Sequence, residues 1–166
     1  MDTIERMERL VMIIKACGGE VLGKKKFQKL IYLAQEKGLY LGYDFGYHYF
    51  GVFSSEVESD LHLGETFGLL KQEVTNYCGN PVKICLTEKN HIDDNEYENV
   101  LSTVSKLSKE ESRTLEVLST ILYLKNAGYT GEKLSSNLQR LKGHLKDFFE
   151  RADKLAQEHY NLNYSI

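Results

Sequence analysis

Residues 24–70 contain the most constraining pattern in the chain, a sharply amphipathic segment followed by a run of tyrosines. From Phe27 onward, apolar side chains recur at i, i+3, i+4 and i+7, which places them on one stripe of an α-helix facing a core. Gly38 is a natural helix end. The opposite face of this helix is predicted to be polar, basic and exposed: Lys25, Gln28, Lys29 and Tyr32.

The pattern changes to period two after this helix, as a β-strand requires. One face of the predicted strand is wholly aromatic, which suits a pleated surface: Tyr43, Phe45, Tyr47 and Tyr49. We expect Gly51 to end the strand. Ser55 and Glu58 have the spacing of a capping box and predict the start of another helix.

The remainder of residues 1–89 predicts one more helix and a β-hairpin. Apolar positions from Ile4 keep helical spacing after a cap at Asp2 or Thr3, up to the glycine pair at 18–19. We expect residues 21–23 to be a connector. The β-compatible runs 69–78 and 82–87 flank a Gly-Asn-Pro turn. Helix, helix, strand, helix, hairpin is the order of a winged helix.

Residues 90–166 are predicted to be helical. A cap at Asp93 and a capping box at Ser108 and Glu111 each open a helix, and the second of these helices is apolar on nearly all sides. From Leu134 to Leu155, apolar residues alternate steps of three and four. We expect two antiparallel helices closing a bundle, with a homodimer through this seam as the alternative.

Length and composition fit one domain spanning residues 1–166. The chain is 42% hydrophobic and 27% charged and has a single proline, so no linker stands out. The predicted fold class is α+β: a mainly helical single domain with a small antiparallel sheet made of the tyrosine-rich strand and the β-hairpin. Residues 1–89 form its winged-helix-like half, and residues 90–166 form its helical half.

The cysteines and the hydropathy indicate a cytoplasmic protein. Three cysteines without a C-x-x-C pair are typical of buried, reduced thiols. The N-terminal segment lacks the apolar core of a secretory signal, and no apolar run approaches a membrane span. We therefore expect a cytoplasmic location and no membrane partner.

The sequence contains weak candidates for catalysis or metal binding. His62 lies at helical spacing from Glu58 and Glu65, but a zinc site needs three or four convergent ligands. Ser54 and Ser55 lack the G-x-S-x-G elbow of a nucleophile, and no phosphate-binding glycine loop is present. We expect no enzymatic activity, no cofactor and no metal.

Nucleic-acid binding is the alternative function, because a winged helix suggests it by analogy. The net charge of −3 and the pI of about 6.0 disfavour it. The third helix, which would enter the major groove, has no lysine or arginine and carries four carboxylates that phosphates would repel: Glu56, Glu58, Asp60 and Glu65.

Two segments carry a resemblance to a known family. The run GKKKFQKLIYLAQ at residues 23–35, followed by Gly51-Val52-Phe53-Ser54, resembles the Panacea domain of SocA-type prokaryotic antitoxins and the related YwgA-like proteins. That family has a K-x-Q-K-x-x-Y-x-A helix followed by a G-P-Y-S turn, and Val52 stands where it has proline. Residues 115–124 are similar, more loosely, to the family's second helical segment.

This resemblance implies a non-enzymatic protein-binding module of antitoxin or adaptor type, in a toxin–antitoxin or phage-defence setting. Its protein partner would be a toxin encoded nearby. Aromatic and basic side chains are also what interface hot spots use. The predicted partner-binding residues are Lys25, Gln28, Lys29, Tyr32, Tyr47, Tyr49, Phe53 and Ser54.

Overall fold

The structure is a computed structural model that describes residues 1–76, 78–79, 81–87 and 95–162. It confirms a mainly helical α+β domain with a small antiparallel sheet. The elements of the first half are α1 (Thr3–Ala16), β1 (Glu20–Leu22), α2 (Lys24–Lys37), β2 (Gly46–His48), β3 (Gly51–Phe53), α3 (Ser55–Thr66), β4 (Leu70–Val74) and β5 (Val82–Leu86). The second half contains the short 3₁₀ turn η1 (Asn95–Tyr97), α4 (Glu98–Leu107), α5 (Ser112–Asn126), α6 (Gly131–Lys142), η2 (Gly143–Phe148) and α7 (Phe149–Tyr160).

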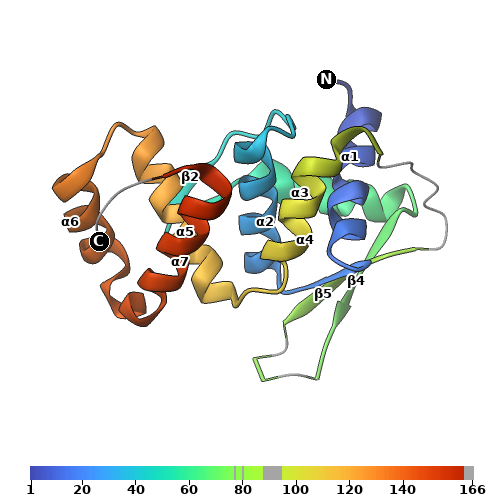
Figure 1. Ribbon diagram of the computed structural model, residues 1–166. Helices are drawn as coiled ribbons and strands as arrows, with labels where there is room; N and C mark the ends of the chain where they lie inside the picture. Colours follow the sequence, from blue (N-terminus) through green and yellow to red (C-terminus); the bar gives the residue numbers. More distant parts are fainter. Residues whose placement is uncertain (77, 80, 88–94, 163–166) are drawn as a thin grey trace.

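The sheet of the first half has the order β1-β5-β4, with both pairs antiparallel. Ile84 in the central strand pairs with Val21 on one side and with Gln72 on the other. Strand β1 lies where the sequence predicted only a connector, and at three residues it is too short to leave a periodic signal. A first strand that joins the later hairpin through its second arm is the sheet arrangement of a winged helix. Figure 1 shows the β4–β5 arm extending from the lower right of the molecule.

The tyrosine-rich segment differs from its prediction. The chain turns back at Tyr49 and Phe50, so that β2 and β3 form a separate two-stranded sheet in which Tyr47 faces Val52. The single strand through residue 50, and its place in the sheet with the β4–β5 hairpin, were wrong predictions. Gly51 has a φ of 97°, a conformation that glycine adopts readily, and it begins β3 instead of ending a strand.

Helix α2 is the centre of the molecule and contacts α1, α4 and α5. Its residues 27–34 are all buried, so only Lys25 of the predicted polar face is exposed. Gln28, Lys29 and Tyr32 are each only 3% exposed. The prediction was wrong because the second half of the chain packs over the side that the first half leaves open. In Figure 1, α5, α6 and α7 gather on one side of α2, and α1 and the three-stranded sheet lie on the other.

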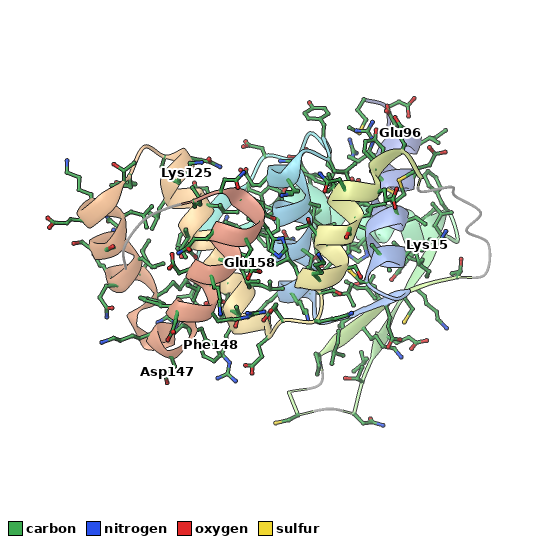
Figure 2. The ribbon with its side chains drawn as sticks, viewed as in Figure 1. Lys15, Glu96, Lys125, Asp147, Phe148 and Glu158 are labelled. Atoms are coloured by element: carbon green, nitrogen blue, oxygen red, sulfur yellow. The ribbon has the colours of Figure 1, made fainter. Side chains whose placement is uncertain are left out.

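The C-terminal helices close the bundle as expected. Helices α6 and α7 both contact α5, and the seam residues Leu134, Leu138 and Leu155 are buried within the single chain. A homodimer through this seam would have to expose that core, so the structure favours the intramolecular alternative. Figure 2 labels Lys125 at one end of this half and Phe148 near the other.

Several predicted helix ends are confirmed and two are corrected. Asp2 caps α1 by accepting a hydrogen bond from the backbone N–H of Glu5 at 2.8 Å, and Gly38 ends α2 in the left-handed conformation. The two capping boxes are absent: α3 is preceded by Ser54 and α5 by Glu111, and neither side chain caps. The predicted cap at residue 93 lies outside the described residues. Within the described ranges, no helix has both the length and the apolar character that crossing a membrane requires.

Candidate functional site

Two glutamines of α2 hold the ends of segment 43–54. The side-chain amide of Gln28 donates to the carbonyl of Ser54 at 3.0 Å and accepts from the N–H of Ser54 at 3.0 Å. Gln35, seven residues further along the helix, donates to the carbonyl of Tyr43 at 2.9 Å and accepts from its N–H at 3.1 Å. Residues seven apart share one helix face. Each glutamine therefore pairs with the backbone as a neighbouring strand would.

Two buried lysines hold the β2–β3 hairpin between these ends. The Lys29 ammonium donates to the carbonyl of Val52 at 3.2 Å, and Lys142, at the end of α6, donates to the carbonyl of Tyr49 at 3.2 Å. Lys142 also forms an ion pair with Glu116 of α5 at 3.1 Å, and its own side chain is 2% exposed. The hairpin is therefore anchored from both halves of the chain.

Lys29, Lys142 and Glu116 form a buried cluster of two ammonium groups and one carboxylate. This excess of positive charge affects the pKa of Lys29. Burial lowers the pKa of Lys29 to about 8, Glu116 opposes this change, and the charges of Lys142 and Lys25 reinforce it. A lysine with a depressed pKa beside a pocket is a feature found at functional sites. Here the amine also has a structural role, because it donates to the backbone of β3.

Tyr32 and Tyr47, two of the predicted site residues, pack against α5. Burial raises the pKa of Tyr32, whose hydroxyl lies 3.5 Å from the amide nitrogen of Asn126. The Tyr47 hydroxyl is 3.0 Å from the hydroxyl of Thr120, and its ring lies 5.4 Å from that of Tyr123. Both tyrosines therefore attach the first half of the chain to α5.

The exposed part of this region is an aromatic and basic patch around the hairpin turn. Tyr49 is 87% exposed and Phe50 is 47% exposed, with ring centroids 4.9 Å apart. The Lys25 ammonium lies 3.3 Å from the centre of the Phe50 ring. We call Lys25, Tyr49, Phe50 and Phe53 the hairpin surface.

A pocket of about 490 Å³ opens at the hairpin surface, between the first turns of α2 and the β2–β3 hairpin. All four residues of the hairpin surface line it, and Lys29 does as well. Lys24 and Glu58 also line it and form an ion pair at 2.6 Å. The pocket thus combines aromatic walls with an excess of positive charge.

The fold brings only some of the predicted site residues together. Those that meet at the pocket are Lys25, Gln28, Lys29, Tyr49 and Phe53. Tyr32 lines a smaller pocket of about 280 Å³, and Tyr47 lies half-buried. Ser54 is 2% exposed, and its hydroxyl has no hydrogen-bond partner among the residues that the structure describes. Phe50, Glu116 and Lys142 were missed. Phe50 had a signal, because it adjoins Tyr49, but the other two come from distant helices.

The acidic third helix is partly neutralised. Asp60 is buried and receives hydrogen bonds from the Arg6 guanidinium and the Tyr43 hydroxyl, both at 2.6 Å. Glu58 is paired with Lys24, and Glu56 and Glu65 remain exposed. His62 is exposed, and no three metal-ligating side chains converge in the described part of the chain. Cys85 is buried as expected, whereas Cys78 is exposed.

The chain is similar in sequence to a protein of Bacillus subtilis. No family model matches the chain. The protein "Uncharacterized protein YwgA" of Bacillus subtilis (strain 168) is 27% identical over 154 residues, which cover 89% of this chain and 90% of that protein. The chain is thus similar to YwgA over nearly its whole length, as its sequence predicted, and the resemblance to the Panacea domain of SocA-type antitoxins stays a prediction.

Proposed function

We propose that this protein is a non-enzymatic protein-binding module of antitoxin or adaptor type, and that its partner docks on the hairpin surface. The exposure of Tyr49 carries the proposal. Large aromatic side chains are usually at least partly buried, yet this ring projects from the turn of an anchored hairpin. Tyrosine is among the residues that dominate binding energy at protein interfaces.

The anchoring of the hairpin supports this role. Lysines 29 and 142 hold the backbone of the hairpin from beneath, and Gln28 fixes the segment's end at Ser54. A surface whose backbone is already held loses less conformational entropy when a partner binds. The backbone that carries the exposed rings therefore does not have to be ordered when a partner binds.

Charge defines the chemistry of the partner. Lys25 belongs to the hairpin surface, and no described carboxylate forms an ion pair with it. We infer a protein partner that presents apolar side chains together with carboxylates, because complementary charge steers association and fixes register. The resemblance to SocA-type antitoxins implies a toxin encoded nearby as this partner. The free thiols of Cys17, Cys78 and Cys85 fit the proposed cytoplasmic location.

A photo-crosslinking amino acid in place of Tyr49, introduced in the native host, should identify the partner, and the same residue in place of Tyr129 provides the background. Tyr129 is an exposed tyrosine in the α5–α6 connection, outside the hairpin surface. The partner is then purified and titrated against unlabelled variants. Tyr49→Ala and Lys25→Glu should each weaken binding by about tenfold or more, and Tyr129→Ala by less than about twofold. Equal binding by all variants would refute the proposed docking surface.

The winged-helix arrangement of β1, β4 and β5 keeps DNA binding as the second candidate. The exposed Glu56 and Glu65 on α3 oppose it, because they would face phosphates in the major groove. In a fluorescence anisotropy titration at physiological salt, we expect no duplex to bind with a dissociation constant near ~10⁻⁸ M. Such binding would favour the DNA-binding regulator instead.

A further inference from the structure

The pocket beneath the hairpin surface has a size and lining that protein docking does not require. Its volume of about 490 Å³ falls within the range of about 300–1,000 Å³ that small-molecule sites occupy. Such sites are lined mostly by apolar and aromatic side chains with a few placed polar groups. Here Phe50, Phe53 and Tyr49 supply the aromatic rings.

The charged side chains that line this pocket include more cations than anions. The carboxylate of Glu58 is paired with Lys24, and the carboxylate of Glu116 is paired with Lys142. Lys25 and Lys29 remain, and no carboxylate of the described residues lies within ion-pair distance of either ammonium. An anion in the pocket would complete this charge arrangement.

Lys29 is the decisive group, because it is buried and its hydrogen bonding is incomplete. The residue is 3% exposed, and its ammonium makes one hydrogen bond within the described residues, to the carbonyl of Val52, although it has three protons to donate. The nearest counter-charge, Glu116, is paired with Lys142, and burying an ammonium that lacks a carboxylate of its own is costly. A ligand carboxylate would supply both the charge and a second acceptor. Burial lowers the pKa of Lys29 by more than the charge of Glu116 raises it, which agrees with this incomplete compensation.

We propose that this pocket binds a small monocarboxylic acid with an aromatic or aliphatic body. The carboxylate would lie between the ammonium groups of Lys29 and Lys25, and the body would lie against the rings of Phe50 and Phe53. The two oxygens of a carboxylate can each accept from one of the two ammonium groups, whereas the largely apolar lining gives the further oxygens of a phosphate few donors. This site goes beyond the proposed docking of a protein, since it requires no partner.

The probe is 4-phenylbutyrate, and its control is 4-phenylbutyramide, which keeps the ring and chain but removes the charge. Titrations are followed by backbone amide signals in ¹H–¹⁵N NMR spectra. The acid should shift the amides of Gly51 and Phe53 and should bind about tenfold more tightly than the amide, because charge-assisted hydrogen bonds are the stronger ones.

Two variants and a matched control connect this binding to the pocket. Lys29→Met keeps the length of the buried side chain, and Lys25→Met changes an exposed residue, so it should leave the fold intact. Each should weaken 4-phenylbutyrate binding by about fivefold or more, whereas Lys125→Met, at an exposed lysine at the far end of α5, should not change it. If Lys29→Met fails to fold, Lys25→Met alone decides. Equal affinities for the acid and the amide, or no binding of the acid up to about 10 mM, would overturn the proposal.

Discussion

Gln28 and Gln35 show how single polar side chains determine the course of the chain around the candidate site. Both lie on α2, and each satisfies a backbone N–H and a backbone C=O of segment 43–54. Burying such groups without partners would cost about 1–3 kcal/mol each. The two residues that flank the hairpin, Tyr43 and Ser54, are thereby fixed on the surface of α2.

We predict that Gln28→Ala destabilises the protein by ~2–5 kcal/mol, because it leaves both backbone groups of the buried Ser54 without a partner. Gln35→Ala is the matched control. Gln35 is only half-buried, so water can replace its amide and the cost should be about 1 kcal/mol. Urea denaturation of both variants checks this, and equal costs would contradict the difference in burial.

Lys29 makes the stability of the protein depend on pH. Its folded-state pKa of about 8 lies below the ordinary value of 10.5, so the unfolded chain binds more protons between these two values. Stability should therefore rise as pH increases through this window. The free energy of unfolding of the wild type, minus that of Lys29→Met, should increase above pH 8 with a slope approaching ~1.4 kcal/mol per pH unit.

Taking the difference between the two proteins cancels groups that titrate in both. One such group is Cys17, whose pKa burial raises to about 11. Urea denaturation from pH 7 to pH 9.5 measures the difference. A difference that stays flat or falls across this range would show that the Lys29 ammonium is not desolvated as the structure indicates.

The β2–β3 hairpin depends on contacts from both halves of the chain. Lys29 of α2 and Lys142 of α6 bind its backbone, and Glu116 of α5 provides the shared counter-charge. Removing one member of a buried ion pair is far more costly than removing both, because the remaining charge is uncompensated. The hairpin should therefore respond to substitutions that lie far away in the sequence.

We predict that Glu116→Gln costs ~3–5 kcal/mol, and that adding Lys142→Met recovers part of this loss. The coupling energy of the double-mutant cycle should exceed ~1 kcal/mol. The exposed pair Arg113 and Glu111 is the matched control, since both side chains are about two-thirds exposed, and its coupling should be below ~0.5 kcal/mol. Additive effects at residues 116 and 142 would contradict the buried pair.

Helix ends could be predicted from the sequence where a single side chain, or the end of a helical spacing of apolar residues, determines them. The end of α2 at Gly38 and the cap of α1 at Asp2 are such cases. The turn at Tyr49 and Phe50 was missed, because alternation of aromatics continues unchanged through it. The burial of Lys29 could not be predicted, because it depends on Glu116 and Lys142, which the sequence places far away.

The second half of the chain covers α2 and supports the hairpin from beneath. Helix α5 contacts both α2 and β3, and α6 and α7 pack on α5 (Figure 1). The polar residues 28, 29 and 32 of α2 thus lie buried between the two halves of the chain. The exposed residues of the candidate site lie at the hairpin turn instead.

The intramolecular seam predicts a monomer in the absence of a partner. Leu134, Leu138 and Leu155 are buried against the rest of the same chain, so no apolar seam remains for a second copy. Sedimentation equilibrium at tens of micromolar protein should give the mass of one chain. A dimer that Leu138→Asp dissociates into folded monomers would show that the seam lies between chains.

Hydrogen–deuterium exchange with and without the purified partner shows whether the hairpin surface binds that partner. The partner should slow exchange at residues 46–53 and in the first turn of α2, beside Lys25. Residues 55–66 and 70–86, the third helix and the β4–β5 arm, should exchange at unchanged rates wherever the structure describes them. Protection confined to α3 and the β4–β5 arm, with unchanged exchange at residues 46–53, would show that the partner binds the winged-helix half and not the hairpin surface.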